Sequence, residues 1–199
     1  MDDIVLRGIA KWPNVPAVYG WLSLDRRGNW RIKGEPISNP NVVAFIARNY
    51  GHDDEGRWFF QNGPQRVFVT LDYAPFVYRI VNDENVPLSI ECHTTKTVTA
   101  VTGAWLDEAG TLLLQTEHGI GIVNDLDIDR VSPNFVDSEG RPLDDDALID
   151  LMEHLQKQQR APLWLRVHGA TVRIEPVNSG TVPQRFGFVS RPAEVSSQQ

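Results

Sequence analysis

Short runs in which apolar and polar residues alternate recur along the chain, and alternation with period two is typical of half-buried β-strands. Residues 19–24 and 29–32 alternate in this way. The connector Asp25-Arg26-Arg27-Gly28 between them supplies the Asp and Gly that a tight turn needs at a position with positive φ. The pattern therefore predicts a β-hairpin near the N-terminus.

The same pattern, with turn residues between the runs, predicts further strands. Asn62-Gly63, Glu117-His118-Gly119 and His168-Gly169-Ala170 are typical of turns, as is the segment 107–110. The expected strands are residues 58–60, 66–71, 76–80, 88–92, 96–101, 101–106, 111–116, 120–123, 163–167, 171–174 and 185–189.

Two segments have helical rather than alternating periodicity. Residues 41–50 place a broad apolar face at helical spacing, with Ser38 or Asn39 as N-cap, Pro40 as first helical residue and Gly51 as the end. Residues 144–158 turn Ala147, Leu148, Leu151, Met152 and Leu155 inward, and Asp144 to Asp146 lie at the positive end of the helix dipole.

An internal similarity suggests that the chain contains two copies of one unit. An offset of 106 residues aligns Gly34 with Gly140, Trp58 with Trp164 and Gly63 with Gly169. Each copy would then comprise a helix and a β-hairpin, and two such units can bury faces that neither buries alone. We therefore expect an α+β fold, mostly antiparallel sheet with two main helices and a possible internal duplication. The expected division is an arm (1–18), two sheet-plus-helix units with one shared core (19–105 and 106–190) and a disordered tail (191–199).

Charge and composition argue against nucleic-acid-binding, membrane-spanning and secreted proteins. The net charge of −7 on 199 residues argues against a nucleic-acid partner, because phosphate neutralisation needs clustered Lys and Arg. No apolar run reaches the length of a membrane span, and the acidic N-terminus differs from a secretory signal. The single cysteine, Cys92, cannot form an internal disulfide. These features favour a cytoplasmic protein without a membrane partner.

Arginines beside aromatic residues form the first candidate binding site. Arg57, Arg66 and Arg79 fall on neighbouring predicted strands, together with aromatic residues that include Trp58 and Tyr78. An aromatic-walled cleft with one or two arginines could hold an anionic small molecule by bidentate hydrogen bonds and stacking. In the alternative interpretation the aromatic residues form the core and the arginines extend to solvent at the sheet edge.

Histidines and acids form the second candidate set. His93 follows Glu91-Cys92, and His118 lies in a predicted turn. A thiolate nucleophile, a base or a metal ligand is one interpretation of these positions, but we favour a buried structural cysteine at a strand end and an ordinary turn histidine. Asp125, Asp127 and Asp129 alternate and would share one strand face, where they could hold a cation or form a solvated edge. We expect no metal and no cofactor.

Several segments resemble proteobacterial families known only as domains of unknown function. They are Gly28-Asn29-Trp30 with Gly34 and Ile37, residues 43–45, Asp54-x-Gly56-Arg57-Trp58-Phe59, Ala74-Pro75-Phe76-Val77 and residues 106–116. The resemblance covers roughly residues 28–125 and implies no activity and no catalytic residue.

These observations favour a non-enzymatic bacterial protein that binds a small anionic ligand or a protein partner, with a homodimer as one possible state. Arg57, Arg66, Arg79, Trp58, Tyr78, His93 and His118 are its candidate ligand-binding residues. The alternative is a hydrolase or metal-dependent enzyme that uses His93, His118 and nearby acids.

Overall fold

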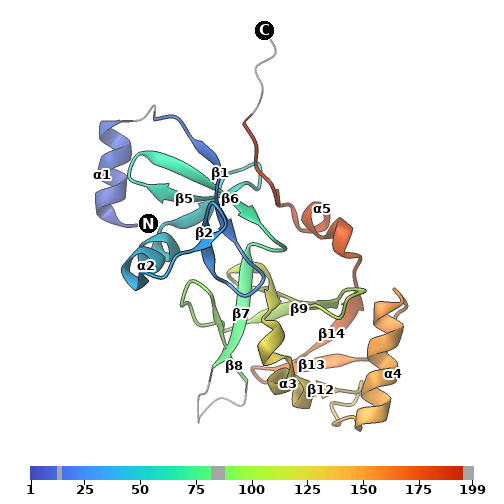
Figure 1. Ribbon diagram of the computed structural model, residues 1–199. Coiled ribbons are helices and arrows are strands. Elements are labelled where there is room, and N and C mark those ends of the chain that lie inside the picture. The colour runs from blue at the N-terminus through green and yellow to red at the C-terminus, as the bar shows by residue number, and fades with distance from the viewer. Residues whose placement is uncertain (13–14, 82–87, 195–199) are drawn as a thin grey trace. The chain divides into compact units, whose positions relative to one another are not determined.

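The chain forms one structural unit, continues into a second, and returns to the first near its C-terminus. In the computed structural model (Figure 1), which describes residues 1–12, 15–81 and 88–194, the first unit comprises Met1–Pro75 and the segment that begins at Phe186. The second unit is Phe76–Arg185. This division differs from the expected boundary after residue 105, because the strand that begins at Phe76 pairs within the second sheet. Residues 195–199 of the predicted disordered tail lie outside the described residues.

The N-terminal unit is a mixed sheet with two helices. Its strands follow the order β3-β2-β1-β6-β5-β4, in which β1 and β6 are parallel and the other neighbours antiparallel. In chain order the elements are α1 (Asp3–Lys11), β1 (Val18–Leu24), β2 (Trp30–Ile32), β3 (Glu35–Pro36), α2 (Pro40–Arg48), β4 (Tyr50–His52), β5 (Trp58–Asn62) and β6 (Gln65–Leu71).

Helix α2 forms where the sequence predicts it, but it ends earlier. The side chain of Asn39 accepts hydrogen bonds from the N–H groups of Asn41 and Val42, and Pro40 is the first helical residue. Tyr50 and Gly51, expected as helix and helix end, lie instead in β4. Asn49 ends the helix because its buried side chain donates to Phe45 O and accepts from the N–H of Asp2, which ties α1 to α2.

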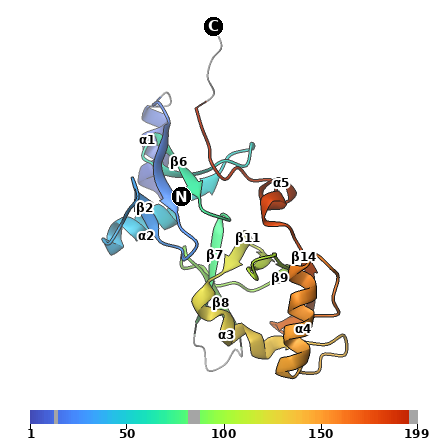
Figure 2. The ribbon, with the colours of Figure 1, turned by 45° about the vertical axis from the view of Figure 1, so that its right-hand side comes forward.

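The C-terminal unit is a larger mixed sheet, in the order β12-β13-β14-β9-β10-β11-β7-β8, with parallel pairs β14–β9 and β11–β7. Helix α4 packs along β14 and β9, as Figure 2 also shows. The elements are β7 (Phe76–Val81), β8 (Ser89–Cys92), β9 (Val101–Leu106), β10 (Leu112–Thr116), β11 (Gly119–Val123), η1 (Asp125–Asp127), α3 (Ile128–Val131), η2 (Ser132–Asn134), β12 (Phe135–Val136), α4 (Asp145–Gln156), β13 (Trp164–Val167), β14 (Ala170–Pro176), η3 (Ser179–Thr181) and α5 (Val182–Phe186).

The core of this unit extends to both faces of its central strand. Leu112, Leu113 and Leu114 of β10 are all fully buried. Consecutive strand residues point to opposite faces, so both faces of the sheet are covered at β10. The apolar run in the sequence therefore marks a strand enclosed on two sides rather than one with a solvent face.

Four loops share one sequence pattern and one hydrogen-bonding arrangement. In each, an aspartate accepts from the backbone N–H groups two and four residues later, and a glycine three residues later has φ between +74° and +83°. The loops are Asp25–Gly28, Asp53–Gly56, Asp107–Gly110 and Asp137–Gly140. In the loop these N–H groups have no carbonyl of a neighbouring strand to donate to, and the aspartate carboxylate accepts their hydrogen bonds instead. These hydrogen bonds fix the register of the strands on either side of the loop.

Three expected strands are wrong. Residues 96–100 form a loop, whose Thr99 and Ala100 N–H groups donate to the Glu117 carboxylate, and the strand begins only at Val101. Residues 125–131 are the short helices η1 and α3, capped by Asn124. Residues 185–189 include the end of α5 and a single bridge between Val189 and Arg57.

The expected fold class also needs correction. The protein is α+β and rich in strands, but both sheets are mixed rather than antiparallel, because β6, β7 and β14 each pair in parallel with a strand distant in sequence. In place of two main helices, the described residues form α1 to α5. None of these helices is long and apolar enough to cross a membrane.

The internal duplication stays a prediction, but the strand order limits how the copies could align. The first sheet reads β4-β5-β6-β1-β2-β3, and part of the second reads β12-β13-β14-β9-β10-β11. In this correspondence the turns at Gly63 and Gly169 are equivalent, as the offset of 106 requires. Helix α2, however, lies between β3 and β4, whereas α4 lies between β12 and β13. The alignment of Gly34 with Gly140 therefore joins two different places in the two sheets.

Glycine at position 56 is required for a second reason besides its positive φ. A Cβ at Gly56 would overlap the carbonyl oxygen of Gly187, in the C-terminal segment that donates from Val189 N–H to Gly56 O. Gly140 occupies the same place in its own loop, with a similar φ of 78° and no atom within 4 Å of an added Cβ.

We expect Gly140→Ala to destabilise the protein by about 1–2 kcal/mol through the positive φ alone. Gly56→Ala should cost about 1–3 kcal/mol more, because the clash is with backbone. It should also speed proteolytic cleavage after Phe186, measured by limited proteolysis alongside thermal unfolding. Equal effects of the two substitutions would contradict the packing of the C-terminal segment on this loop.

Candidate functional site: an apolar cavity in the N-terminal unit

The pairing of β1 with β6 contains a bulge. Val18 pairs with Val67 and Leu22 with Val69, so β1 advances four residues while β6 advances two. Gly20 lies in the bulge with φ of 71°, a value that glycine adopts without strain. The bulge changes the direction of the Trp21 side chain, so that Trp21 and its neighbour Leu22 line the same cavity rather than opposite faces.

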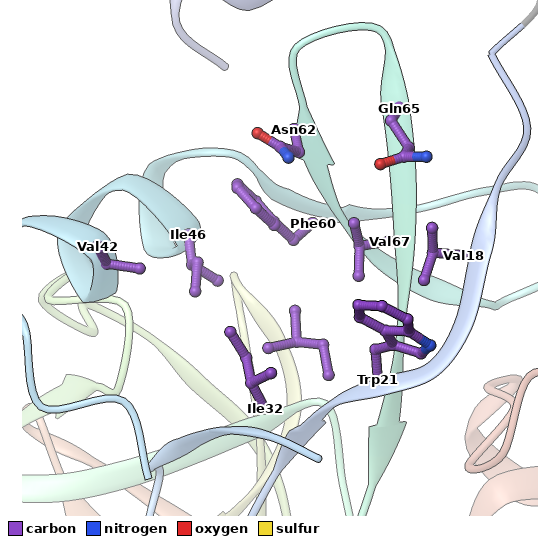
Figure 3. A pocket seen from close by; sticks show the side chains of 10 residues that line it. Val18, Trp21, Ile32, Val42, Ile46, Phe60, Asn62, Gln65 and Val67 are labelled. Carbon is purple, nitrogen blue, oxygen red and sulfur yellow. The ribbon is translucent and has the colours of Figure 1, made fainter. Parts of the chain in front are cut away.

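A cavity of about 420 Å³ lies beside this bulge, bounded by β1, β2, β5, β6 and α2 (Figure 3). This volume falls within the range of small-molecule sites. Eight of the lining side chains are apolar and two are amides: Val18, Trp21, Leu22, Ile32, Val42, Ile46, Phe60 and Val67, with Asn62 and Gln65. None of these ten residues is ionisable.

The lining has an apolar end and an amide end. Phe60 pairs with Val67, and Asn62 with Gln65, so these four side chains share one face of the β5–β6 hairpin. Figure 3 shows Asn62 and Gln65 together at one end and Trp21 with Ile32 at the other. Gln65 Nε2 donates to Pro16 O at 3.0 Å, which leaves its oxygen as an acceptor.

The cavity is open to solvent at its apolar end. Trp21 is 54% exposed, Ile32 46% and Val42 39%. Large apolar side chains exposed next to a cavity are typical of a binding surface. Helix α2 has only nine residues and covers the sheet with Val42 and Ile46, so part of this face stays uncovered.

The arginines and Trp58 predicted from the sequence lie elsewhere in this unit. Arg57 forms ion pairs with Asp53 at 2.8 Å and Glu55 at 3.1 Å, and its guanidinium stacks on Phe68. Arg66 stacks on Phe59, which packs edge-on against Phe68. Because Phe59 and Phe68 alternate with Phe60 and Val67, this cluster lies on the sheet face opposite the cavity.

Trp58 shares the face of Phe60 but packs between Tyr50 and His52, with ring centroids 4.8 Å from each. None of the seven predicted residues is among those that line the cavity. The structure brings Arg57 and Arg66 to one face of the first sheet. Arg79, Tyr78, His93 and His118 belong to the second unit.

Tyr78 and His118 make contacts that hold loops in place. The hydroxyl of Tyr78 donates to Gly119 O at 2.8 Å and lies 2.7 Å from Thr116 Oγ1, and burial raises the pKa of this phenol. His118 Nε2 lies 2.8 Å from Thr97 O, next to the Glu117 carboxylate that binds the same loop. Both residues are used in fixing the turn at the start of β11.

His93 is half-buried in the turn after β8, with its ring nitrogen Nε2 inside the protein, and Val77 N–H donates to its Nδ1 at 3.3 Å. Burial lowers the pKa of His93 to about 3, so the imidazole is neutral at physiological pH. Neighbouring Cys92 is buried, with Sγ 2.8 Å from Thr94 Oγ1. This agrees with the simpler interpretation of a structural cysteine at a strand end.

The acids predicted as an alternating row are separated by the helices that replace the strand. Asp127 is buried, accepts from Ile80 N–H at 3.1 Å, and pairs with Arg130 at 3.3 Å and Arg79 at 3.8 Å. Leu126 between the acids is 64% exposed. Across residues 1–12, 15–81 and 88–194, no group of three or more His, Cys, Asp or Glu lies close enough to hold a metal ion.

Comparison with known proteins shows the family. A family model described as "Protein of unknown function (DUF2946)" matches residues 1–193. The chain belongs to this family. No curated protein matches the sequence. The expected membership of a domain-of-unknown-function family is thus confirmed, and no activity comes with it.

Two solved structures are similar to this chain. A DUF1285 family protein from Silicibacter pomeroyi DSS-3 has a TM-score of 0.53 and 16% identity, covering 85% of this chain and 87% of that one. A DUF1285 family protein from Shewanella baltica OS155 has a TM-score of 0.42 and 14% identity, covering 55% of this chain and 91% of that one. At 16% identity, the likeness to the Silicibacter pomeroyi protein supports a shared fold and says nothing of function.

Sequence reasoning missed the cavity in this DUF2946 protein because it treated residues 19–24 as a regular strand. A glycine within a strand often indicates a bulge, and Gly20 was the available sign. Trp21 and Ile32 fall in predicted strands and Val18 at the end of the predicted arm, and nothing in their spacing shows that these elements would leave a space between them.

His93 should make stability depend on pH in a defined range. Its folded pKa, about 3, lies below the unfolded value of about 6.5. Between these two pKa values His93 is protonated in the unfolded chain but not in the folded one. The contribution of neutral His93 to the free energy of unfolding is therefore lost as pH falls from 6.5 towards 3. We expect the free energy of unfolding to fall by about 1.4 kcal/mol per pH unit through this group.

The measurement is urea unfolding between pH 7 and 4, with His93→Gln as the variant. The free energy of unfolding of this variant should change less steeply with pH than that of the wild type, by about 1.4 kcal/mol per pH unit. Glu117→Gln is the control, because hydrogen bonds outweigh burial and hold the Glu117 pKa near 2, so its effect begins only below pH 4.5. Parallel profiles for wild type and His93→Gln between pH 6.5 and 4.5 would show that His93 titrates normally.

Proposed function

We propose that the chain is a small-molecule binding protein and that its N-terminal unit takes an apolar group into the cavity beside the β1 bulge. The observation that carries this proposal is the cavity itself, about 420 Å³ with eight apolar lining residues and an exposed rim. Apolar surface in an open cavity is in contact with water, so an apolar occupant removes this surface from water and gains dispersion contacts with the lining.

The lining supports binding rather than chemistry at this place. Its polar groups are the amides of Asn62 and Gln65, which orient a ligand by hydrogen bonds but do not exchange protons near neutral pH. General acid–base or nucleophilic catalysis needs an ionisable or nucleophilic side chain in contact with the substrate. The enzyme alternative around His93 and His118 has less support, since both contact backbone groups of their own unit.

The arginine–aromatic cluster supports the anionic ligand less well than the sequence suggested. Arg57 already pairs with two carboxylates, and Arg66 lies over an aromatic ring on the face opposite the cavity. We therefore place the binding function at the cavity. A cytoplasmic location remains part of the proposal, supported by a single buried thiol, Cys92.

We also propose that the two sheets are copies of one ancestral unit, with α4 inserted between β12 and β13 of the second copy. The common strand order and the loops Asp25–Gly28 and Asp107–Gly110, which join the first two strands of each copy, support this alignment. The bulge distinguishes the copies, since β9 and β14 keep one register over their pairs. The cavity would then be a feature acquired by the first copy.

Filling the cavity should abolish binding without unfolding the protein. Val67 is a half-buried strand residue that lines the cavity. We expect Val67→Phe to weaken binding of N-phenyl-1-naphthylamine, a neutral apolar fluorescent probe, at least tenfold, because the ring occupies the space that the probe needs. Fluorescence titration measures this, and circular dichroism checks the fold.

The matched control is Val172→Phe, which enlarges a half-buried strand valine of the second unit, outside the cavity. This variant should bind the probe like the wild type. Absence of probe binding by the wild type, or equal loss in both variants, would remove the basis of the proposed function.

A further inference from the structure

Lys33 lies at the exposed end of the cavity and is held there at two points. Its backbone N–H donates to Trp21 O at 2.8 Å, and its Nζ lies 3.9 Å from the centroid of the Trp21 ring. Trp21 lines the cavity and is 54% exposed. A cation over an indole is attracted by the electron-rich face of the ring, so the ammonium is fixed close to the rim.

The backbone at Lys33 is unusual for a lysine. Lys33 and Gly34 form the two-residue turn between β2 and β3, with φ of 50° and 88°. Turns with positive φ at both central positions favour Asn, Asp and Gly, because other side chains are strained there. A lysine kept at such a position suggests a role for its side chain.

The charge of Lys33 is available to a ligand. Among the described residues Lys33 forms no ion pair, whereas Arg31 in the preceding strand β2 pairs with Asp25 at 3.1 Å. The nearest acid in the sheet register is Glu35, which lies opposite Ile32 on β3 and is exposed. Glu35 thus lies on the cavity face and would oppose an anion, which makes it a useful control.

We propose that the cavity takes an amphiphilic carboxylate, with its alkyl chain among the apolar lining residues and its carboxylate beside Lys33; this rests on the proposed function. The ammonium offers a charge-assisted hydrogen bond to the carboxylate at the open end. Ile46, Phe60 and Val67 surround the chain inside. The exposed Asn62 and the half-buried Gln65 mark the far end of the apolar lining, so a chain that extends past them returns to water, and the site favours chains of medium length.

The test compares three probes with the same ten-carbon chain: decanoate, decanol and decylamine, titrated by calorimetry below the concentrations at which they form micelles. Wild-type protein should bind decanoate about fivefold more tightly than decanol, as an exposed charge pair allows, and decylamine most weakly. Added salt should reduce this preference. Affinity for shorter carboxylates should fall about fourfold per CH₂ removed, and chains much longer than decanoate should gain nothing further.

Lys33→Asn is the decisive variant, because asparagine suits the positive φ and so preserves the turn while it removes the charge. It should lose the preference for decanoate over decanol, with decanol affinity changed less than twofold. Lys33→Arg should keep the preference, and Glu35→Gln should keep or increase it.

The outcomes separate the two proposals. Equal binding of all three probes to the wild type, or an unchanged preference in Lys33→Asn, would overturn the assignment of a carboxylate while leaving an apolar binding site. Failure of decanol and of the neutral fluorescent probe to bind would overturn the proposed function itself.

Discussion

Strand register in this protein depends on aspartate carboxylates that bind backbone N–H groups within tight loops. In the loops that begin at Asp25 and Asp53, the hydrogen bonds outweigh the burial of the carboxylate, and the pKa of each aspartate is lowered. A loop tied in this way allows no slippage, and a one-residue slip would turn every side chain of a strand to the other face. The loop at Asp25 thus decides which residues of β1 and β2 face α2.

Because the register of β1 is fixed at its C-terminal end, the bulge in its pairing with β6 lies at its N-terminal end. The Asp25 loop holds Leu22 and Leu24 opposite Ile32 and Trp30, and β6 pairs in parallel with the same two leucines. The two additional residues of β1 therefore fall between Val18 and Leu22, where Gly20 accommodates them. The cavity lies beside this bulge, where Trp21 and Leu22 both line it and α2 contributes Val42 and Ile46.

The sequence predicted local structure well and spatial assembly poorly, for identifiable reasons. The hairpin at Asp25, the cap at Asn39 and the turn at Gly63 depend on neighbouring residues, and the structure agrees with them. Residues 125–129 alternate like a strand, but their helical form depends on Asp127 reaching Ile80, and residues 96–100 are set by Glu117. The cavity depends on five elements at once, whereas Arg57 pairs with local carboxylates and Arg66 stacks on Phe59 on the opposite face.

The same reasoning explains why charge belongs at the rim of this cavity and not inside it. An ionised group among Ile46, Phe60 and Val67 would lose most of its hydration without a partner, at a cost larger than such a small unit could offset. At the exposed Lys33 turn an ammonium keeps its contact with water and lies on Trp21. A ligand that matches this division must itself be apolar along its body and charged at one end. In the proposed site, selectivity would come from the charge at the rim, and affinity from the apolar volume that the ligand fills.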